Sequence, residues 1–153
     1  MKVYKFGGTS VGSPERIRAL IPLINDGETK IVVLSAMAGT TNALMEISGL
    51  YSSGDTASAN RHAELLREKY ISVAGELFTT EEGKGKARTL IDEQFNFITS
   101  ILSRPYSLHN EKRIVARGEL ISTGFLHFLL AETGIPSLLV PALSFMRIDK
   151  DSE

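Results

Sequence analysis

The first segment with residues suited to chemistry is Lys5-Phe6-Gly7-Gly8-Thr9-Ser10-Val11, which follows a short run of β-branched and aromatic residues. Two adjacent glycines let a ligand approach the backbone closely, and their N–H groups can form a concave site for an anion. Lys5 adds a positive charge, and Thr9 and Ser10 add hydroxyl groups. The glycine spacings of a Walker A loop and of a dinucleotide-binding loop are both absent from the sequence. Taken alone, the double glycine is more often a tight turn.

A second candidate is the loop Ser35-Ala36-Met37-Ala38-Gly39-Thr40-Thr41-Asn42, between an apolar run and a predicted helix. A helix N-terminus presents N–H groups without partners and the positive end of the helix dipole, and both attract anions. Thr41 or Asn42 could simply cap the helix, and for this loop alone that structural interpretation is favoured. Two such loops at one edge of a sheet strengthen the case for an anion site.

The third candidate is Arg117-Gly118-Glu119-Leu120-Ile121-Ser122, which we expect inside the last long helix. Gly118 costs a helix roughly 1 kcal/mol relative to alanine, so it indicates close packing or close approach of a ligand. Glu119 could face solvent or a pocket, and periodicity alone favours solvent. The three histidines, His62, His109 and His127, lie far apart in the sequence and lack the spacing of metal ligands. We therefore predict that none of them binds a metal.

The elements expected around the first two loops form a βαβ unit. Residues 2–6 read as a strand, and Ser13-Pro14 begins a helix in which Pro22 predicts a kink or an early end, with closure at residues 25–27. Residues 30–36 read as a second strand, whose unbroken apolar run at 31–34 is typical of a strand covered on both faces. This pattern predicts an α/β fold with three layers, α/β/α, and a mainly parallel sheet.

The rest of the chain is predicted to be mostly helical before it returns to the sheet. Apolar residues at helical spacing predict one helix that carries residues 65–77. They predict another that begins at a capping box of Thr79 and Glu82 and carries apolar residues from 90 to 101. After Pro105 a single long helix is expected up to Gly134. We then predict a third strand at 137–140 and a possible fourth at 143–148, and an incomplete sheet of this kind suggests a truncated chain.

Composition limits the possible functions. The 153 residues are enough for one domain, and 17 basic against 18 acidic residues give a net charge of −1, which argues against nucleic acid and membrane surfaces as partners. There is no cysteine, which excludes disulfides and thiolate sites, and the N-terminus has no signal-peptide pattern. We therefore expect a cytoplasmic protein, and the open edge of its sheet favours a homo-oligomer.

Together the three segments resemble the aspartate kinases of the amino acid kinase family. The resemblance rests on KFGGTSV at residues 5–11, VVLSAMAGTTN at 32–42 and GELIS at 118–122, which occur in the order found in the family. It extends to FMRID at 145–149, although Ile148 stands where the family often has threonine.

The resemblance implies a reaction and a set of roles. The reaction is phosphorylation of the β-carboxylate of L-aspartate by ATP to give 4-phospho-L-aspartate, the first step of lysine, threonine and methionine biosynthesis. It implies a carbamate kinase-like fold in which residues 1–153 form the N-terminal, amino-acid-binding lobe, without the nucleotide lobe and regulatory domains and so without activity alone. Lys5 would be catalytic, Mg²⁺ would be carried by the nucleotide, and the ATP phosphates would be bound by Lys5, Phe6, Gly7, Gly8, Thr9 and Ser10. The residues implied to bind aspartate are Ser35, Thr41 and Glu119.

Two alternatives stay open. One is a sibling kinase that forms an acyl phosphate on glutamate or acetylglutamate. The other is an anion-binding module without catalysis.

Overall fold

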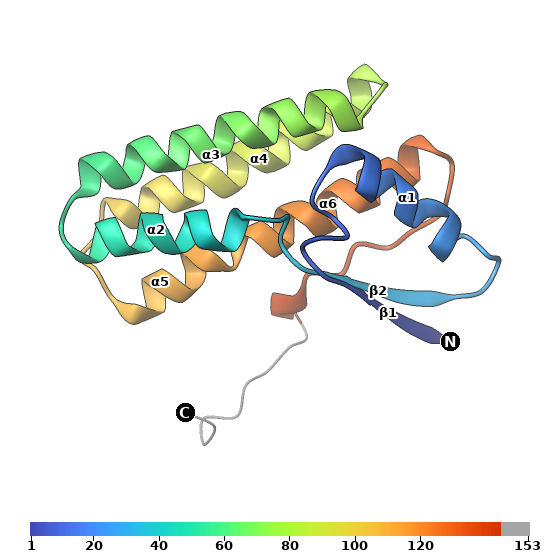
Figure 1. Ribbon diagram of the computed structural model, residues 1–153, viewed down its shortest axis with the longest axis horizontal. Helices are drawn as coiled ribbons and strands as arrows, with labels where there is room; N and C mark the ends of the chain where they lie inside the picture. Colours follow the sequence, from blue (N-terminus) through green and yellow to red (C-terminus); the bar gives the residue numbers. More distant parts are fainter. Residues whose placement is uncertain (145–153) are drawn as a thin grey trace.

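Two parallel strands, β1 (Lys2–Phe6) and β2 (Lys30–Leu34), form the sheet in the computed structural model, which describes residues 1–144. Their register pairs Lys2 with Lys30 and Phe6 with Leu34. Helix α1 (Pro14–Ile24) connects the two strands, so the predicted βαβ unit is confirmed (Figure 1).

Helix α1 begins as predicted and closes at Asn25, within the predicted residues 25–27, but it has no early end at Pro22. The Ser13 side chain accepts a hydrogen bond from the Arg16 N–H at 3.3 Å, and Pro14 takes the first helical position. The early end expected at Pro22 is wrong, since the helix continues to Ile24 and Asn25 donates to the Ile21 carbonyl at 2.9 Å. Pro22 lies in the last turn, where its missing N–H removes only one hydrogen bond.

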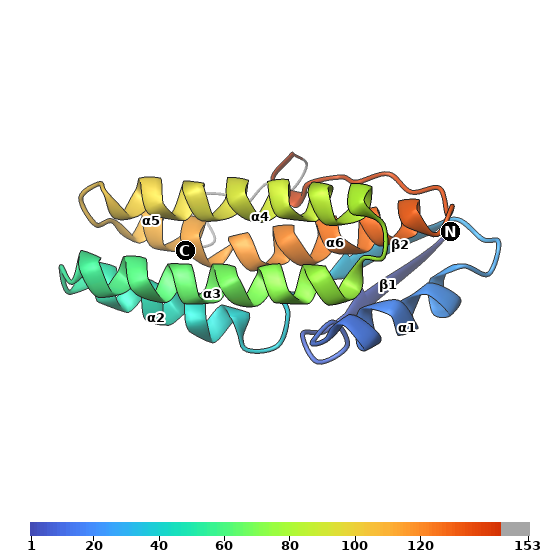
Figure 2. The same cartoon turned by 90° about the horizontal axis from the view of Figure 1, so that it is seen from above.

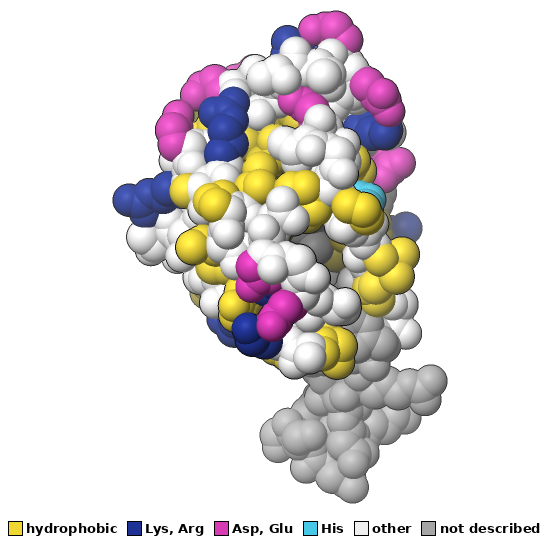
Figure 3. Space-filling model, turned by 90° about the vertical axis from the view of Figure 1, so that its right-hand side faces the viewer, with side chains coloured by type: hydrophobic (Ala, Val, Ile, Leu, Met, Phe, Trp, Pro, Cys, Tyr) yellow, Lys and Arg dark blue, Asp and Glu magenta, His cyan; other side chains and the backbone are white. Residues whose placement is uncertain are grey.

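Only one face of the sheet is covered by the described residues. Helices α1 and α6 (Arg117–Glu132) lie over it, whereas Val3, Ile31 and Val33 on the opposite face are 63%, 46% and 42% exposed. The prediction that the run at 31–34 is covered on both faces is therefore wrong for this part of the chain, because all the covering helices pack on one side. The space-filling view shows hydrophobic side chains uncovered at this end of the molecule (Figure 3).

Up to residue 144, five α-helices follow β2, and three of them are long. Helix α3 packs between α2 and α4, and α6 lies against α4 with its C-terminal end reaching the sheet (Figures 1 and 2). An aromatic cluster fills the centre: the rings of Tyr70 and Phe95 are 6.1 Å apart, those of Tyr70 and Phe125 are 6.0 Å apart, and those of Phe78 and Phe125 are 5.7 Å apart. The bounds are α2 Thr40–Ser52, α3 Thr56–Leu77, α4 Glu81–Leu102 and α5 Leu108–Val115.

The single long helix predicted after Pro105 is wrong, because α5 and α6 meet in a bend at Ala116. The bend leaves the Arg113 carbonyl to accept a hydrogen bond from the Arg117 Nε at 2.9 Å. By length and composition alone, the stretch Leu108–Glu132 could cross a membrane, but half of its apolar window is buried inside the protein. Its packing against α4 is that of a core helix.

The predicted third strand at 137–140 is also wrong. Residues 137–140 pair with no strand among residues 1–144, and Leu138 is 86% exposed. Pro136 and Pro141 flank the segment and have no N–H to donate to a ladder. Of the predicted fourth strand, residues 143–144 belong to a 3₁₀ turn, Ala142–Ser144, and 145–148 lie outside the described residues, as does the whole FMRID segment at 145–149.

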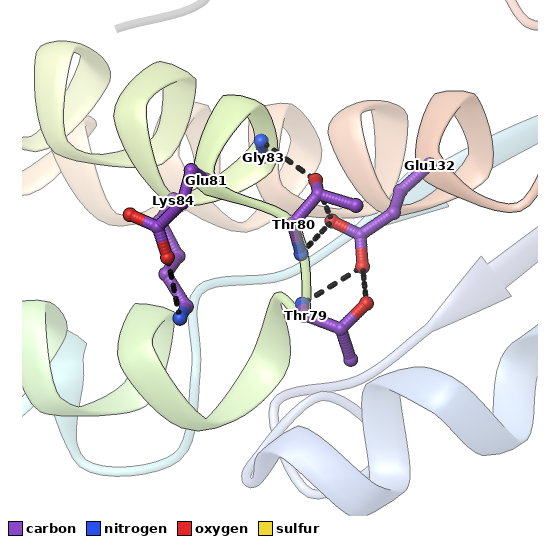
Figure 4. Close-up of polar contacts among 6 residues, drawn as sticks. All are labelled: Thr79, Thr80, Glu81, Gly83, Lys84 and Glu132. Atoms are coloured by element: carbon purple, nitrogen blue, oxygen red, sulfur yellow. Dashed lines mark hydrogen bonds and ion pairs between the residues drawn. The ribbon is translucent and has the colours of Figure 1, made fainter.

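The start of α4 differs by one residue from the predicted capping box. Thr80 is the N-cap, and its side chain accepts from the Gly83 N–H at 3.0 Å. The carboxylate that binds this turn belongs to Glu132 on α6 and not to Glu82. It accepts four hydrogen bonds from Thr79 and Thr80 (Figure 4). Partial burial raises the pKa of Glu132, but these bonds outweigh it and lower the pKa to about 2. A long-range carboxylate thus replaces the predicted local one.

Candidate functional site

The three segments singled out in the sequence meet at the carboxyl ends of β1 and β2. The Ser35 N–H donates to the Phe6 carbonyl at 3.0 Å, which holds the two loops together. A Cβ on Gly8 would lie 2.9 Å from the Ala36 carbonyl oxygen, and one on Gly118 would lie 2.7 Å from the Ala36 Cβ. Only glycine allows these approaches, so the close packing predicted for Gly118 is confirmed.

The first loop is a turn whose leading N–H groups stay free. Ser10 donates to the Gly7 carbonyl at 2.9 Å. The N–H groups of Gly7 and Gly8 make no hydrogen bond within residues 1–144. Arg16 of α1 donates from Nη1 to the Thr9 carbonyl at 2.7 Å and brings a second cation to the turn. The sequence analysis missed Arg16, although its place in the first turn of the following helix was a usable signal.

Lys5 and Phe6 face opposite sides of the sheet. Lys5 pairs with Val33 in the register, and its exposed side chain lies on the open face. Within the described part of the chain Lys5 makes no ion pair or hydrogen bond, so its charge is free to meet a ligand. The Phe6 side chain packs against the core on the covered face, which leaves only its backbone at the site.

The second loop enters α2 without a side-chain cap. Gly39 is the N-cap residue with φ of +81°, a conformation that favours glycine. The prediction that Thr41 or Asn42 caps the helix is therefore wrong. Both residues are exposed in its first turn, and their N–H groups make no hydrogen bond within residues 1–144. An uncapped helix start with free N–H groups is suited to an anion.

Two residues of α3 complete this corner, and the sequence analysis assigned neither to a site. Tyr70 shares a 2.8 Å hydrogen bond with the buried Thr40 side chain. Burial, with a smaller contribution from the Glu119 charge, raises the pKa of Tyr70 to about 12, although the bond to Thr40 opposes the rise. The Lys69 ammonium lies 4.0 Å from where a Cβ on Gly39 would be. No sequence signal links these residues to the loop, because tertiary packing alone brings α3 there.

Glu119 lies in the first turn of α6 and is half-buried, so the solvent position favoured by periodicity is only partly correct. Its charge contributes to the raised pKa of Tyr70. The adjacent Ser122 side chain turns back to its own helix and donates to the Gly118 carbonyl at 3.2 Å.

The corner therefore combines free N–H groups and cations with one carboxylate. Such a set can bind an anion beside an ammonium group. Residues 1–144 contain no group of three or more His, Asp or Glu side chains able to hold a metal ion. That Lys5, Ser35 and Glu119 contact one shared ligand stays a prediction.

Residues 1–152 match the family model described as Amino acid kinase family. The chain belongs to the amino acid kinase family. Among its curated relatives in this family is the aspartokinase of Rickettsia prowazekii, 33% identical over 109 residues that cover 64% of the chain and 23% of the relative. The bifunctional aspartokinase/homoserine dehydrogenase of Daucus carota is 31% identical, with 86% of the chain and 15% of the relative covered. The chain thus spans less than a third of the length of these relatives.

Solved structures of the amino acid kinase family share the fold. E. coli aspartokinase III in complex with lysine and aspartate has a TM-score of 0.71 at 24% identity, covering 89% of this chain and 30% of that one. The same enzyme in complex with aspartate and ADP has a TM-score of 0.67 at 23% identity, covering 88% and 29%. The chain therefore has the α/β amino acid kinase fold, with a small parallel sheet and many helices.

Proposed function

We propose that the chain is the amino-acid-binding part of an enzyme that transfers the γ-phosphoryl group of ATP to the β-carboxylate of L-aspartate, giving 4-phospho-L-aspartate and ADP. The observation that carries the proposal is the convergence of the Gly8 turn, the Ala36 loop and Gly118 at the ends of the two strands. The names of the relatives support the reaction, and the E. coli complexes with aspartate and ADP support the two ligands.

In this mechanism Lys5 neutralises charge on the transferring phosphoryl group. Phosphoryl transfer needs mainly positioning and electrostatic stabilisation, because its transition state spreads charge over the equatorial oxygens. The free N–H groups of Gly7 and Gly8 donate to phosphate oxygens, with Thr9 and Ser10 beside them. The aspartate carboxylate is already ionised at neutral pH, so no general base is required.

The second and third segments hold the amino acid. Ser35 and the uncapped start of α2 at Thr41 are suited to a carboxylate, and the Glu119 carboxylate is suited to the ammonium group. Tyr70 and Lys69 support this side, the first by fixing Thr40 and the second by its charge. These roles agree with the family resemblance of residues 32–42 and 118–122.

The parts of the molecule around the site are expected to be completed by other groups. Residues 1–153 correspond to an N-terminal lobe, and the apolar open face of the sheet is suited to a further helical layer that would complete three layers. Mg²⁺ would be carried by the nucleotide phosphates, where it would neutralise part of their charge. A homo-oligomer and a cytoplasmic location stay predictions.

The test is the Lys5→Met variant of the enzyme that carries these residues. Loss of one such cation should lower kcat/KM by roughly 100- to 1,000-fold, equivalent to about 3–4 kcal/mol. Trapping the acyl phosphate with hydroxylamine measures the product, and comparison of L-aspartate with L-glutamate and acetylglutamate separates the sibling kinases.

Lys2→Met is the matched control, because Lys2 is an exposed lysine of the same strand that pairs with Glu28 at 2.6 Å. It should leave turnover unchanged. Equal activity of Lys5→Met and Lys2→Met would remove Lys5 from the mechanism, and phosphate binding without any turnover would favour the non-catalytic module.

A further inference from the structure

A groove of about 300 Å³ lies between α3 and α4, away from the ends of the strands. Its size falls at the lower end of the range of small-molecule pockets. None of the residues assigned to the kinase site contributes to it. The lining residues are Ile71, Ala74 and Gly75 on α3, with Glu81, Lys84, Gly85, Arg88 and Ile91 on α4.

Two glycines keep this groove open, although the fold does not require glycine at either position. Gly75 and Gly85 both lie inside helices and have no positive φ, and a Cβ at either position would meet nothing within 4 Å. The neighbouring Gly83 differs, because a Cβ there would collide with the Glu132 carboxylate and the Phe78 ring. Glycine is among the poorest helix formers, so two glycines facing one groove preserve space at a cost to both helices.

The lining has an apolar floor and a cationic rim. Ala74 and Ile91 are buried, and Ile71 is half-buried beside them. At the rim, Lys84 pairs with Glu81 at 3.0 Å, and both side chains extend from α4 on the side of α3 (Figure 4). Arg88 is exposed and makes no ion pair or hydrogen bond within residues 1–144. The free charge at this groove is therefore a guanidinium.

We propose that this groove binds a small organic anion with an apolar body, whose carboxylate pairs with Arg88. A guanidinium can hold a carboxylate through two parallel hydrogen bonds, which fixes the orientation of the ligand. The branched or aromatic part of the ligand then covers the floor formed by Ala74 and Ile91 and occupies the space left by Gly75 and Gly85. Lys84 is already paired with Glu81, which leaves Arg88 as the group that holds the carboxylate.

The test follows the backbone amides of Gly75 and Gly85 in ¹H–¹⁵N NMR spectra during titration with phenylacetate. Both signals should shift saturably, with a Kd in the millimolar range expected for a ligand of about ten non-hydrogen atoms. Phenylacetamide, which has the same shape without the charge, should bind about tenfold more weakly.

Two variants and one control separate a built site from general surface binding. Arg88→Gln should weaken phenylacetate about tenfold, whereas Arg61→Gln, an exposed arginine elsewhere on α3, should leave the Kd unchanged. Gly85→Leu should fill the groove and abolish the shift at Gly75, while a raised Tm shows that the fold is intact.

Three results would overturn the proposal. One is a phenylacetate shift that does not saturate, and another is an unchanged Kd in Arg88→Gln. The third is a shift of the two glycine amides with protein concentration alone, which would assign the groove to contact between two copies of the chain.

Discussion

Single side chains decide how a ligand is held where the three segments meet. The buried Thr40 and Tyr70 side chains bond to each other, so the start of α2 is fixed before any ligand arrives. Glu119 is the acidic group beside them, and its charge reaches Tyr70. A half-buried carboxylate next to a fixed corner is suited to binding one cation in one orientation.

Replacing Glu119 by glutamine should therefore raise the KM for aspartate and leave kcat nearly unchanged. The variant keeps the shape but loses the charge that pairs with the ammonium group. Loss of one charge-assisted hydrogen bond, about 1.5–3 kcal/mol, corresponds to a rise in KM of roughly 10- to 100-fold. Steady-state kinetics with varied aspartate at saturating ATP measures it.

Glu68→Gln is the control, because Glu68 is exposed on α3 and makes no ion pair in the described structure. If Glu119→Gln and Glu68→Gln give the same KM, Glu119 has a structural role only.

Among the helices, α6 is the one that holds the site together, through a contact at each end. At its start, Gly118 lies against Ala36 and Thr40 of the second loop. At its end, Glu132 binds the turn between α3 and α4 (Figure 4). Both contacts join segments far apart in the sequence.

Gly118→Ala should destabilise the protein, against the usual effect of this change in a helix. The new Cβ would lie 2.7 Å from the Ala36 Cβ and 2.8 Å from the Thr40 Cγ2, and relieving such overpacking costs about 1–3 kcal/mol. Gly49→Ala in α2 is the control: its Cβ meets nothing within 4 Å, so it should stabilise by about 1 kcal/mol. Urea unfolding measures both. Opposite signs are expected, and a stabilising Gly118→Ala would contradict the close contact.

Glu132→Gln should lower the free energy of unfolding at pH 7 by about 1–2 kcal/mol, because the variant loses a charged acceptor of hydrogen bonds. The pKa of Glu132 in the folded protein is about 2, below its ordinary value of 4.5. Its contribution is therefore complete above about pH 4.5 and is lost as the pH falls toward 2. The stability difference between wild type and variant should shrink over that interval.

Denaturant unfolding at several pH values measures this difference. Glu93→Gln, an exposed position on α4, should show no such dependence. A constant difference from pH 7 to pH 2 would show that the charge of Glu132 contributes nothing.

The elements that the sequence predicted are those with local signals. Ser13-Pro14 marked the start of α1, and apolar spacing marked α3 and α4. The errors arose where contacts between residues far apart in the sequence decide the local structure. The turn before α4 is bound by Glu132 and its N-cap is Thr80 instead of the predicted Thr79, and α2 begins at Gly39 without a side-chain cap. The segment at 137–140 has strand-forming residues but no partner strand within the described chain.

The loops of the site were recognised by their residue types. Lys69 and Tyr70 could not be recognised in this way, since only tertiary packing brings α3 to these loops.

Over the whole molecule, stability is distributed unevenly between the helices and the sheet. The aromatic cluster around Phe125 lies among α3, α4 and α6, whereas the sheet formed by residues 1–144 has two strands and one open face. Two strands alone are marginal, so the strands depend on the helices that cover them. The candidate site lies at the border between these two parts.

Hydrogen exchange should reveal this difference and locate the ligands. Amides of β1 and β2 should exchange faster than those in the middle of α6, because the strands open locally without unfolding the helical core. Aspartate with a non-hydrolysable ATP analogue, each at about ten times its Kd, should slow exchange about tenfold in residues 5–11 and 35–42. Peptides from the middle of α4 serve as the internal control and should not change. Protection confined to α4, or equal protection throughout, would place the ligands elsewhere than at the strand ends.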